Sequence, residues 1–417
     1  MSQQGVLFVV ETQLSHFGLS PLVAAQRLGL RTVFVARDPG RYAGHGVPVG
    51  PADLADRVVQ ADTREASAVV AAVRSTTDLG QVRGLCTFTD YSVAVVAQAA
   101  RELGLAGLSP DAARRARNKL ETRRACARAG VPAPLFAWAD TEEAAVAAAH
   151  AMGYPCVVKP ATEAGSIGVR LCRDAGEVRR HFCALVGDER DFRGQAKPVG
   201  ALVEEYLVGY EVSVECVLID GRCRVLGVVD KVLAAHPHFV EIGESFPSML
   251  PEPVSRDAAE VAQAALDAIG HDFGAAHVEL KVTGTGAKLV EINARPAGGD
   301  ITRLIAEATG IDLPSQVVRL HTGLPADVTP VRNRAAASRY ITAGATGTVH
   351  AVHGVELAHR VADSIDVELE VTVGDEVRLP TSNMDTIGRI IAVGANTAEA
   401  VRLADAALGQ IQVEVLR

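Results

Sequence analysis

Residues 276–296, AHVELKVTGTGAKLVEINARP, contain two runs that are typical of β-strands, 276–282 and 288–296. The Thr-Gly-Thr-Gly segment between the runs predicts a tight hairpin turn. Side chains alternate between the two faces of a strand, so Glu291 and Asn293 share a face. An antiparallel pairing can bring Glu279 of the first strand onto that same face.

Three oxygen-bearing side chains on one rigid surface suit a hard cation such as Mg²⁺. Arg295 follows at the end of the second strand and could bind an anion beside the metal. The alternative is an exposed hairpin face with solvated charges, which is the better explanation of an isolated Glu-x-Asn pattern. Other parts of the chain have to decide between these two interpretations.

The composition predicts a soluble globular protein. The length of 417 residues predicts two or three domains, and a hydrophobic content of 48% is ample for their cores. The net charge of −9 and an aromatic content of 4% argue against nucleic acid or a membrane as partner. The chain shows no signal peptide or membrane span, and its seven cysteines show no C-x-x-C pair. We therefore expect a cytoplasmic protein whose main partner is neither nucleic acid nor a membrane, and a homodimer is left open.

The order of elements predicts an α/β protein. Strands and helices alternate over residues 5–110, which predicts a parallel sheet with helices on both faces. The dinucleotide fingerprint is missing, because the stretch after the first strand (11–18) has one glycine. A single helix is expected over 112–129, a hairpin-like unit over 201–219, a long polar stretch over 234–253 and a helix over 255–269. From about residue 325 the pattern becomes a small α+β unit.

Two lysines and a glycine-rich loop suggest a phosphate site. Lys159 ends a Val-Val strand, and Gly165, Ser166, Ile167 and Gly168 follow it closely. Small residues let backbone N–H groups approach phosphate oxygens, while a lysine supplies positive charge. Lys119 would be a second cation from another segment. Each lysine alone is equally well explained as a solvated side chain.

The stretch Glu204-Glu205-Tyr206-Leu207 suits the adenine of a nucleotide. Backbone groups of such a connecting segment can read the purine edge, and Glu211 a few residues later can accept from the ribose hydroxyls. A surface position on a strand is the alternative for Glu211. The order of these parts along the chain carries more weight than any one of them.

That order resembles the ATP-grasp superfamily of carboxylate–amine ligases, most specifically over residues 119–300. The resemblance implies an ATP-grasp fold with three domains: a Rossmann-like one (1–111), an ATP-clamping one (112–325, with a lid at about 150–208) and a small α+β one (326–417). It implies ATP with two Mg²⁺ ions, with Mn²⁺ as an alternative metal. The implied nucleotide contacts are Lys119, Lys159, Gly165, Ser166, Ile167, Gly168, Glu204, Glu205, Leu207 and Glu211. The implied metal ligands are Glu279, Glu291 and Asn293, with Arg295 and Lys159 as catalytic residues.

Within that superfamily, residues 230–248 look like the dipeptide-forming L-amino acid ligases, whose relatives include alanine–anticapsin ligase and carnosine synthase. The resemblance makes Glu241 a contact for a substrate ammonium. It makes Arg295 and the backbone of Gly298 and Gly299 contacts for carboxylate or phosphate, with Lys231 and Glu244 in the same substrate region. Position 244 can differ among relatives, so side-chain specificity stays open.

The resemblance implies small-molecule substrates and an ADP-forming ligation, in which the carboxylate of an amino acid or another acid becomes an acyl phosphate and an amine displaces the phosphate. Two alternatives remain open. One is another ATP-grasp enzyme, of the biotin carboxylase or purine-pathway kind, and the other is a nucleotide-binding regulator without catalysis.

Overall fold

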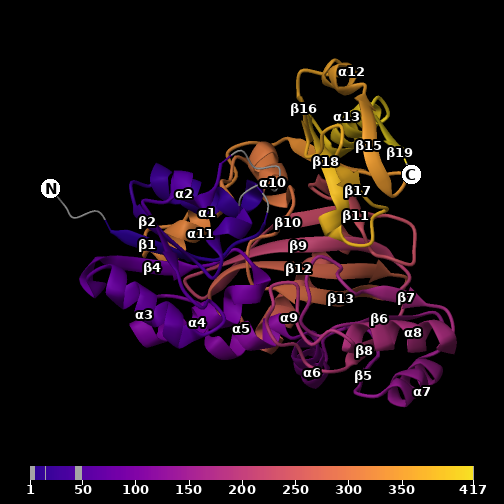
Figure 1. Ribbon diagram of the computed structural model, residues 1–417, viewed down its shortest axis with the longest axis horizontal. Helices are drawn as coiled ribbons and strands as arrows, with labels where there is room; N and C mark the ends of the chain where they lie inside the picture. Colours follow the sequence, from indigo (N-terminus) through magenta and orange to yellow (C-terminus); the bar gives the residue numbers. More distant parts are fainter. Residues whose placement is uncertain (1–4, 15, 43–48, 417) are drawn as a thin grey trace.

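The computed structural model describes residues 5–14, 16–42 and 49–416, and this part of the chain is a mixed α/β protein with four sheets (Figure 1). The largest sheet lies in the middle of the molecule. The N-terminal sheet, a small sheet with two helices and a C-terminal layer surround it. None of the helices in the described ranges is long and apolar enough to cross a membrane.

The N-terminal sheet is parallel, with the strand order β3-β2-β1-β4. Alternate side chains of its central strand enter two different cores. Leu7 and Val9 pack in one core, and Val6, Phe8 and Val10 pack in the other. Helices therefore cover both faces, which confirms the expected βαβ arrangement. The elements are β1 (Val6–Val10), β2 (Arg31–Ala36), β3 (Arg57–Gln60), β4 (Val82–Cys86), α1 (Ser20–Arg27), α2 (Pro51–Leu54), α3 (Ala66–Thr76) and α4 (Val93–Leu103), with the 3₁₀ turns η1 (His16–Leu19), η2 (Pro39–Tyr42), η3 (Leu79–Gln81) and η4 (Asp90–Ser92).

The central sheet has eight strands in the order β13-β12-β9-β10-β11-β14-β18-β16, and every neighbouring pair is antiparallel. Its strands are β9 (Tyr210–Ile219), β10 (Arg222–Leu233), β11 (Glu241–Phe246), β12 (Gly274–Thr283), β13 (Gly286–Asn293), β14 (Ala335–Thr342), β16 (Ile365–Leu369) and β18 (Thr386–Gly394). One face is apolar. It packs on α9 (Glu252–Ile269) at the β12–β13 side and on α13 (Thr397–Leu408) at the β14–β18 side.

Four further helices fill the space around this sheet. They are α5 (Pro110–Arg117), α6 (Lys119–Ala129), α10 (Ile301–Thr309) and α11 (Leu313–His321). The buried residues Ile301, Leu304 and Ile305 of α10 share a core with α1 and with Ala336 of β14. This shared core joins the N-terminal sheet to the central sheet.

Two smaller sheets complete the fold. The first has the order β5-β8-β6-β7, with β5 (Phe136–Ala139), β6 (Cys156–Lys159), β7 (Arg170–Cys172), β8 (Ala201–Glu205), α7 (Glu142–Met152) and α8 (Ala175–Val186). Its helices cover one face, and its strands lie below the central sheet in Figure 1. The second has the order β17-β15-β19, with β15 (Gly347–His353), β17 (Glu376–Val377), β19 (Gln412–Leu416), α12 (Val355–His359) and the turn η5 (Asn383–Asp385).

The predicted single helix over 112–129 is wrong, because the chain breaks at Asn118. Its backbone is extended, with φ −108° and ψ 106°, and its side chain accepts hydrogen bonds from the backbone N–H groups of Leu120 and Glu121. This is an N-cap, which starts a new helix at Lys119.

Two other expected segments also differ. The predicted hairpin over 201–219 is wrong, because β8 and β9 belong to different sheets. The polar stretch 234–253 contains β11, a strand of the central sheet, in its middle. The central sheet also contains strands from both sides of residue 325, because β11 pairs with β14. The two boundaries between the three expected domains stay predictions.

Candidate functional site

A polar face runs across the central sheet opposite the helix α9. At one side, Glu291 lies directly opposite Glu279, and Asn293 lies opposite His277. The register continues the same face onto β9, where Glu211 lies opposite Lys281. The hairpin of β12 and β13 therefore places its three predicted metal ligands on one surface.

A β-bulge extends this face onto β11. Lys231 pairs with Glu244 and Leu233 pairs with Glu241, so Ile242 is an extra residue on the bulged strand. Glu241 and Glu244 are three apart in sequence, and a regular strand would point them to opposite faces. The bulge puts both on the polar face.

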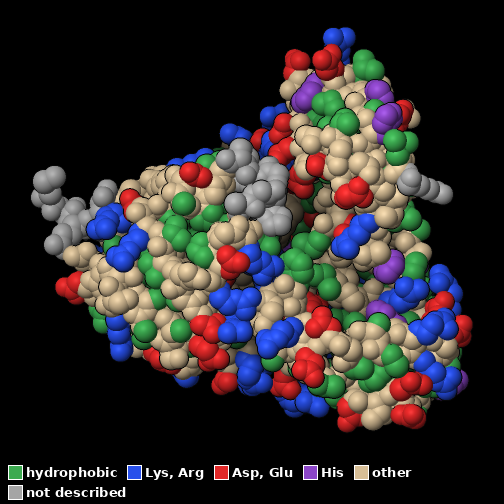
Figure 2. Space-filling model, in the orientation of Figure 1, with side chains coloured by type: hydrophobic (Ala, Val, Ile, Leu, Met, Phe, Trp, Pro, Cys, Tyr) green, Lys and Arg blue, Asp and Glu red, His purple; other side chains and the backbone are tan. Residues whose placement is uncertain are grey.

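A cavity of about 700 Å³ lies over this face. Figure 2 shows the molecule hollowed between its N-terminal and C-terminal parts. Residues from all four sheets or their loops line the cavity, among them Asp90, Lys159, Glu279 and Asn383. All the residues predicted to bind nucleotide, metal or substrate line it, except Gly168 and Lys231.

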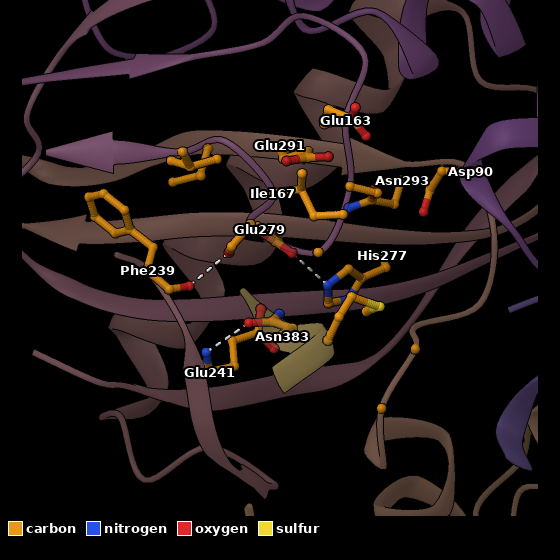
Figure 3. A pocket seen from close by; sticks show the side chains of 18 of the residues that line it. Asp90, Glu163, Ile167, Phe239, Glu241, His277, Glu279, Glu291, Asn293 and Asn383 are labelled. Carbon is orange, nitrogen blue, oxygen red and sulfur yellow. Dashed lines mark hydrogen bonds and ion pairs between the residues drawn. The ribbon is translucent and has the colours of Figure 1, made fainter. Parts of the chain in front are cut away.

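The predicted metal ligands point into the cavity together (Figure 3). Glu279 forms an ion pair with Lys231 at 3.0 Å and accepts a hydrogen bond from His277 at 3.1 Å. With its amide nitrogen turned toward them, Asn293 donates to Asp90 Oδ1 at 3.0 Å and to Glu291 Oε1 at 3.1 Å. The hard oxygen ligands fit Mg²⁺.

No group of three or more His, Cys, Asp or Glu side chains in the described ranges could hold a metal by itself. Two carboxylates and an amide fit a cation that the protein shares with substrate phosphates, since Mg²⁺ is usually bound in that way. The residues present therefore fit the expected divalent cation.

His277 is a charged residue under this surface. Burial lowers its pKa, but the carboxylates of Glu215 and Glu279 outweigh burial and raise the pKa to about 10. Its Nδ1 lies 2.6 Å from Glu215 Oε1. His277 therefore holds Glu279 in place as an imidazolium.

The two predicted phosphate lysines lie in the cavity wall, and both are paired. Lys119 donates to the backbone oxygen of Glu163 at 2.6 Å and to Glu291 Oε1 at 2.9 Å. Lys159 contacts Glu204 Oε2 at 2.7 Å, and its pKa is lowered, mainly by burial. Both side chains are almost fully buried, so the interpretation of solvated surface lysines is wrong.

The glycine loop, residues 165–168, lies over the cavity and is held by the far end of the chain. Gly165, Ser166 and Gly168 have positive φ angles of 65°, 59° and 71°. Ser166 Oγ donates to the backbone oxygen of Phe239 at 2.7 Å. The backbone N–H of Asn383 donates to the oxygen of Gly165 at 3.2 Å.

Asn383 was not predicted to belong to the site, because it lies in a polar turn without a motif. Its side-chain oxygen accepts a hydrogen bond of 2.9 Å from the backbone N–H of Glu241, and Figure 3 shows this bond as a dashed line. The C-terminal residues therefore join the glycine loop to the predicted ammonium contact.

The residues predicted for adenine and ribose lie together at one side of the cavity. Glu204 is buried, and Arg123 with Lys159 lowers its pKa although burial alone would raise it. Arg123 also donates to the backbone oxygen of Val290 at 2.7 Å. Because Arg123 and Lys159 both hold Glu204, this residue anchors the cavity wall and does not offer a free carboxylate. Glu211 pairs with Lys281 at 3.0 Å.

Arg295 has a carboxylate partner that sequence reasoning did not assign to the site. Its Nε and Nη2 lie 2.7 Å and 2.5 Å from Asp90 Oδ2. Asp90 begins the turn after β4, and its sequence context predicts only a helix cap. The carboxyl end of a parallel strand is where α/β sheets place ligand residues, and this rule could have pointed to Asp90.

The predicted substrate residues fall into two groups. Glu241, Glu244, Gly298 and Gly299 line the cavity. Lys231 is fully buried beneath it, with Nζ 2.7 Å from Glu241 and 3.0 Å from Glu279. Lys231 therefore lies behind the cavity wall, where it positions the two carboxylates, and its place in the substrate region stays a prediction.

Three family models match this chain. They describe an ATP-grasp N-terminal domain over residues 22–107, an ATP-grasp domain over 152–303 and the L-amino acid ligase C-terminal domain 2 over 339–416. The two ATP-grasp models together cover more than half of the chain, which belongs to the ATP-grasp family. Enzymes of this family use ATP with Mg²⁺ or Mn²⁺.

Relatives of this ATP-grasp chain cover most of its length. An uncharacterised protein, y4rH of Sinorhizobium fredii, is 29% identical over 396 residues, which are 94% of this chain and 80% of that protein. Carnosine synthase 1 of Gallus gallus is 31% identical over 72% of this chain and 33% of its own length. Alanine–anticapsin ligase of Bacillus subtilis is 30% identical over 56% of this chain and 52% of its own length. The chain therefore spans about a third of the length of carnosine synthase and about half of the length of alanine–anticapsin ligase.

A solved structure has the same fold. The L-amino acid ligase from Bacillus licheniformis superposes over 100% of both chains with a TM-score of 0.81, at 22% sequence identity. This likeness confirms the expected α/β ATP-grasp fold.

Proposed function

We propose that this protein uses ATP to activate the carboxylate of an amino acid as an acyl phosphate and then joins it to an amine. ADP and phosphate are the other products. The observation that carries the proposal is the convergence of Lys119, Lys159 and the glycine loop with the opposed pair Glu279 and Glu291 around one cavity. A phosphate-transfer site needs these cations, oxygen ligands and backbone donors together.

Activation is needed because the oxide of a free carboxylate is a poor leaving group. Attack of the carboxylate oxygen on the γ-phosphorus breaks the bond to ADP, and attack of the amine on the carbonyl then expels phosphate. The divalent cations would neutralise charge on the β- and γ-phosphates when bound. We propose that Glu279, Glu291 and Asn293 hold two Mg²⁺ ions.

The lysines would exchange protein carboxylates for phosphate oxygens. Lys119 and Lys159 each already hold a carboxylate within 3 Å, so their ammonium groups are oriented before any substrate arrives. This orientation reduces the reorganisation that the reaction requires.

Arg295 would stabilise negative charge on the acyl phosphate and on the tetrahedral intermediate. Asp90 fixes its guanidinium through Nε and Nη2, which leaves Nη1 for a ligand or for its present bond to the oxygen of Pro296. The loss of one such donor typically costs about a hundredfold to a thousandfold in rate.

The glycine loop would exclude water, which otherwise hydrolyses an acyl phosphate. Its bonds to Phe239 and Asn383 hold it over the cavity. The adenine and ribose would bind beside Glu205, Leu207 and Glu211, which line the same cavity.

A nucleotide assay tests the proposal. ATP and mixtures of amino acids should yield ADP and phosphate in equal amounts, and mass spectrometry should detect an amide. Release of AMP, or no turnover with any pair of carboxylate and amine, would contradict it. Turnover that requires bicarbonate would support the alternative of a carboxylase-like enzyme, and tight ATP binding without turnover would support a regulator. The cytoplasmic location and the homodimer stay predictions.

A further inference from the structure

One end of the cavity is acidic. We call it the acid end and define it by its lining residues Glu241, Glu244, Asp300 and Glu370. Tyr340 and Gly299 complete its wall. The first two carboxyls come from β11, and the others come from the start of α10 and from the segment after β16.

Among the described residues, Lys231 and Arg389 form ion pairs with the acid end, and both are shared with carboxylates outside it. Lys231 pairs with Glu241 at 2.7 Å but divides its charge with Glu279. Arg389 lies 3.4 Å from Asp300 and 3.8 Å from Glu370, and it also pairs with Glu368. Within the described part of the chain, these two cations thus serve the acid end and two further carboxylates.

Glu244 is the least compensated of these groups. Its side chain is 1% exposed, and Oε2 accepts both of its hydrogen bonds, from Tyr340 at 3.0 Å and Ser338 at 3.3 Å. Among the described residues, Oε1 accepts none. Burial, with Glu241 and Asp300 nearby, raises the pKa of Glu244 well above its usual value. A buried carboxyl that lines a cavity with one oxygen unused is suited to a donor from a ligand.

The backbone of Gly299 packs closely against the wall of the acid end. A Cβ at this position would lie 2.5 Å from Tyr340 Oη and 3.3 Å from Glu244 Oε1. A side chain here would therefore press on Tyr340 and Glu244, the two residues that form this part of the wall.

We propose that the acid end binds a cationic side chain, so that one substrate of this protein is a basic amino acid such as lysine, ornithine or arginine. The inference rests on the proposed ligase function and names the substrate class of the same site. Glu241 would take the α-ammonium group, and the unused Oε1 of Glu244 would take the positive end of the side chain. A positive charge beside Glu244 would offset the cost of ionising this buried carboxyl, which a neutral side chain cannot do.

Matched pairs of substrates test the charge directly. The rate of phosphate release should be measured with lysine against norleucine, and with arginine against citrulline. Each pair has a similar length and differs in the charge of the side chain. We expect a preference of about a hundredfold in kcat/KM for the charged member, since a charge-assisted bond to a buried group is worth about that much. A preference for the neutral member, or for glutamate, would overturn the inference.

The substitution Glu244→Gln tests which residue carries the preference. It keeps the shape of the side chain, and we expect the ratio of lysine to norleucine to fall by about thirtyfold. Glu260→Gln, on the exposed face of α9, is the matched control and should leave the ratio unchanged. An unchanged ratio in Glu244→Gln, in a variant with an unaltered unfolding transition, would remove Glu244 from this role.

Binding without turnover separates the two proposals. Calorimetry with lysine and norleucine measures the acid end even if no phosphate is released. Lysine binding that Glu244→Gln weakens, with no release from ATP, would retain the acid end and overturn the ligase reaction. Phosphate release without any preference for a charged side chain would retain the ligase reaction and overturn the proposed role of the acid end.

Discussion

The two sides of the polar face differ in how their charges are balanced. On β12, β13 and β9, each acid has a close cation: Lys119 for Glu291, Lys231 and His277 for Glu279, and Lys281 for Glu211. We call this side the nucleotide half. At the acid end, carboxyls outnumber the cations that the described residues bring to them. A balanced surface can exchange its internal ion pairs for phosphates and Mg²⁺ together, whereas an unbalanced acidic one is suited to a cation alone.

The substitution Glu291→Gln breaks the nucleotide half and should have the largest effect. It removes one of the two opposed carboxylates and the partner of Lys119, and we expect kcat for ATP turnover to fall by about a thousandfold. The measurement is phosphate release at saturating ATP. Glu260→Gln is again the control and should stay near the parent rate. A loss of less than about tenfold in Glu291→Gln would remove this residue from the metal site.

The substitution Asp300→Asn tests the acid end through its pH dependence. Burial is the main cause that raises the pKa of Asp300 from 3.8 to about 6, so its ionisation opposes folding. The folded protein binds this proton more tightly than the unfolded chain, and stability from this group is lost as pH rises from about 4 to 6. The free energy of unfolding of Asp300→Asn, relative to the parent, should therefore increase by about 2 kcal/mol between about pH 4.5 and pH 6.5.

Urea unfolding at several pH values measures this difference. Asp363→Asn, at an exposed position of the same region, should show no such pH dependence relative to the parent. If the difference in free energy of unfolding between Asp300→Asn and the parent stays constant over this pH range, burial does not raise the pKa of Asp300.

The nucleotide half was largely predictable from sequence, and the acid end was not. Alternation along β13 places Glu291 and Asn293 on one face, and a bulge at Val290, where the register between β12 and β13 shifts, brings Glu279 onto that face as well. The common face of Glu241 and Glu244 depends on the bulge at Ile242, which leaves no signal in the chain. Regular alternation would have separated these two residues.

Contacts between distant segments were equally hidden. Asp90 meets Arg295 across 205 residues, and Asn383 meets Glu241 across 142. Neither Asp90 nor Asn383 belongs to a local motif, so only the folded chain brings these two residues to the site. The parallel N-terminal sheet was predictable for the opposite reason, since the βαβ alternation is a property of neighbouring segments.

The substitution Asp90→Asn sharpens the comparison at the border of the nucleotide half. The amide cannot hold the guanidinium of Arg295 as an ion pair, and we expect kcat to fall by about thirtyfold, as for other residues that orient a functional group. The KM for ATP should change less than kcat, because Arg295 is proposed to act on the acyl phosphate. Steady-state kinetics measure both. Asp62→Asn, which breaks an exposed pair with Arg64, is the control. An equal loss in the control would show a general effect on folding.

The substitution Gly299→Ala should have the smallest effect and should separate the two halves within one variant. The added Cβ narrows the acid end beside Tyr340 and Glu244, so we expect the KM for the amino acid to rise about tenfold. The KM for ATP should not change, because the nucleotide half lies on other strands. The residue has a φ of 60°, so alanine also costs about 1 kcal/mol of stability. Gly323→Ala isolates that cost, since Gly323 has a φ of 71° and a Cβ added there would meet no described atom within 4 Å. If both variants shift KM equally, backbone strain explains the effect; if Gly299→Ala alone does so, the space beside Glu244 belongs to the amino acid.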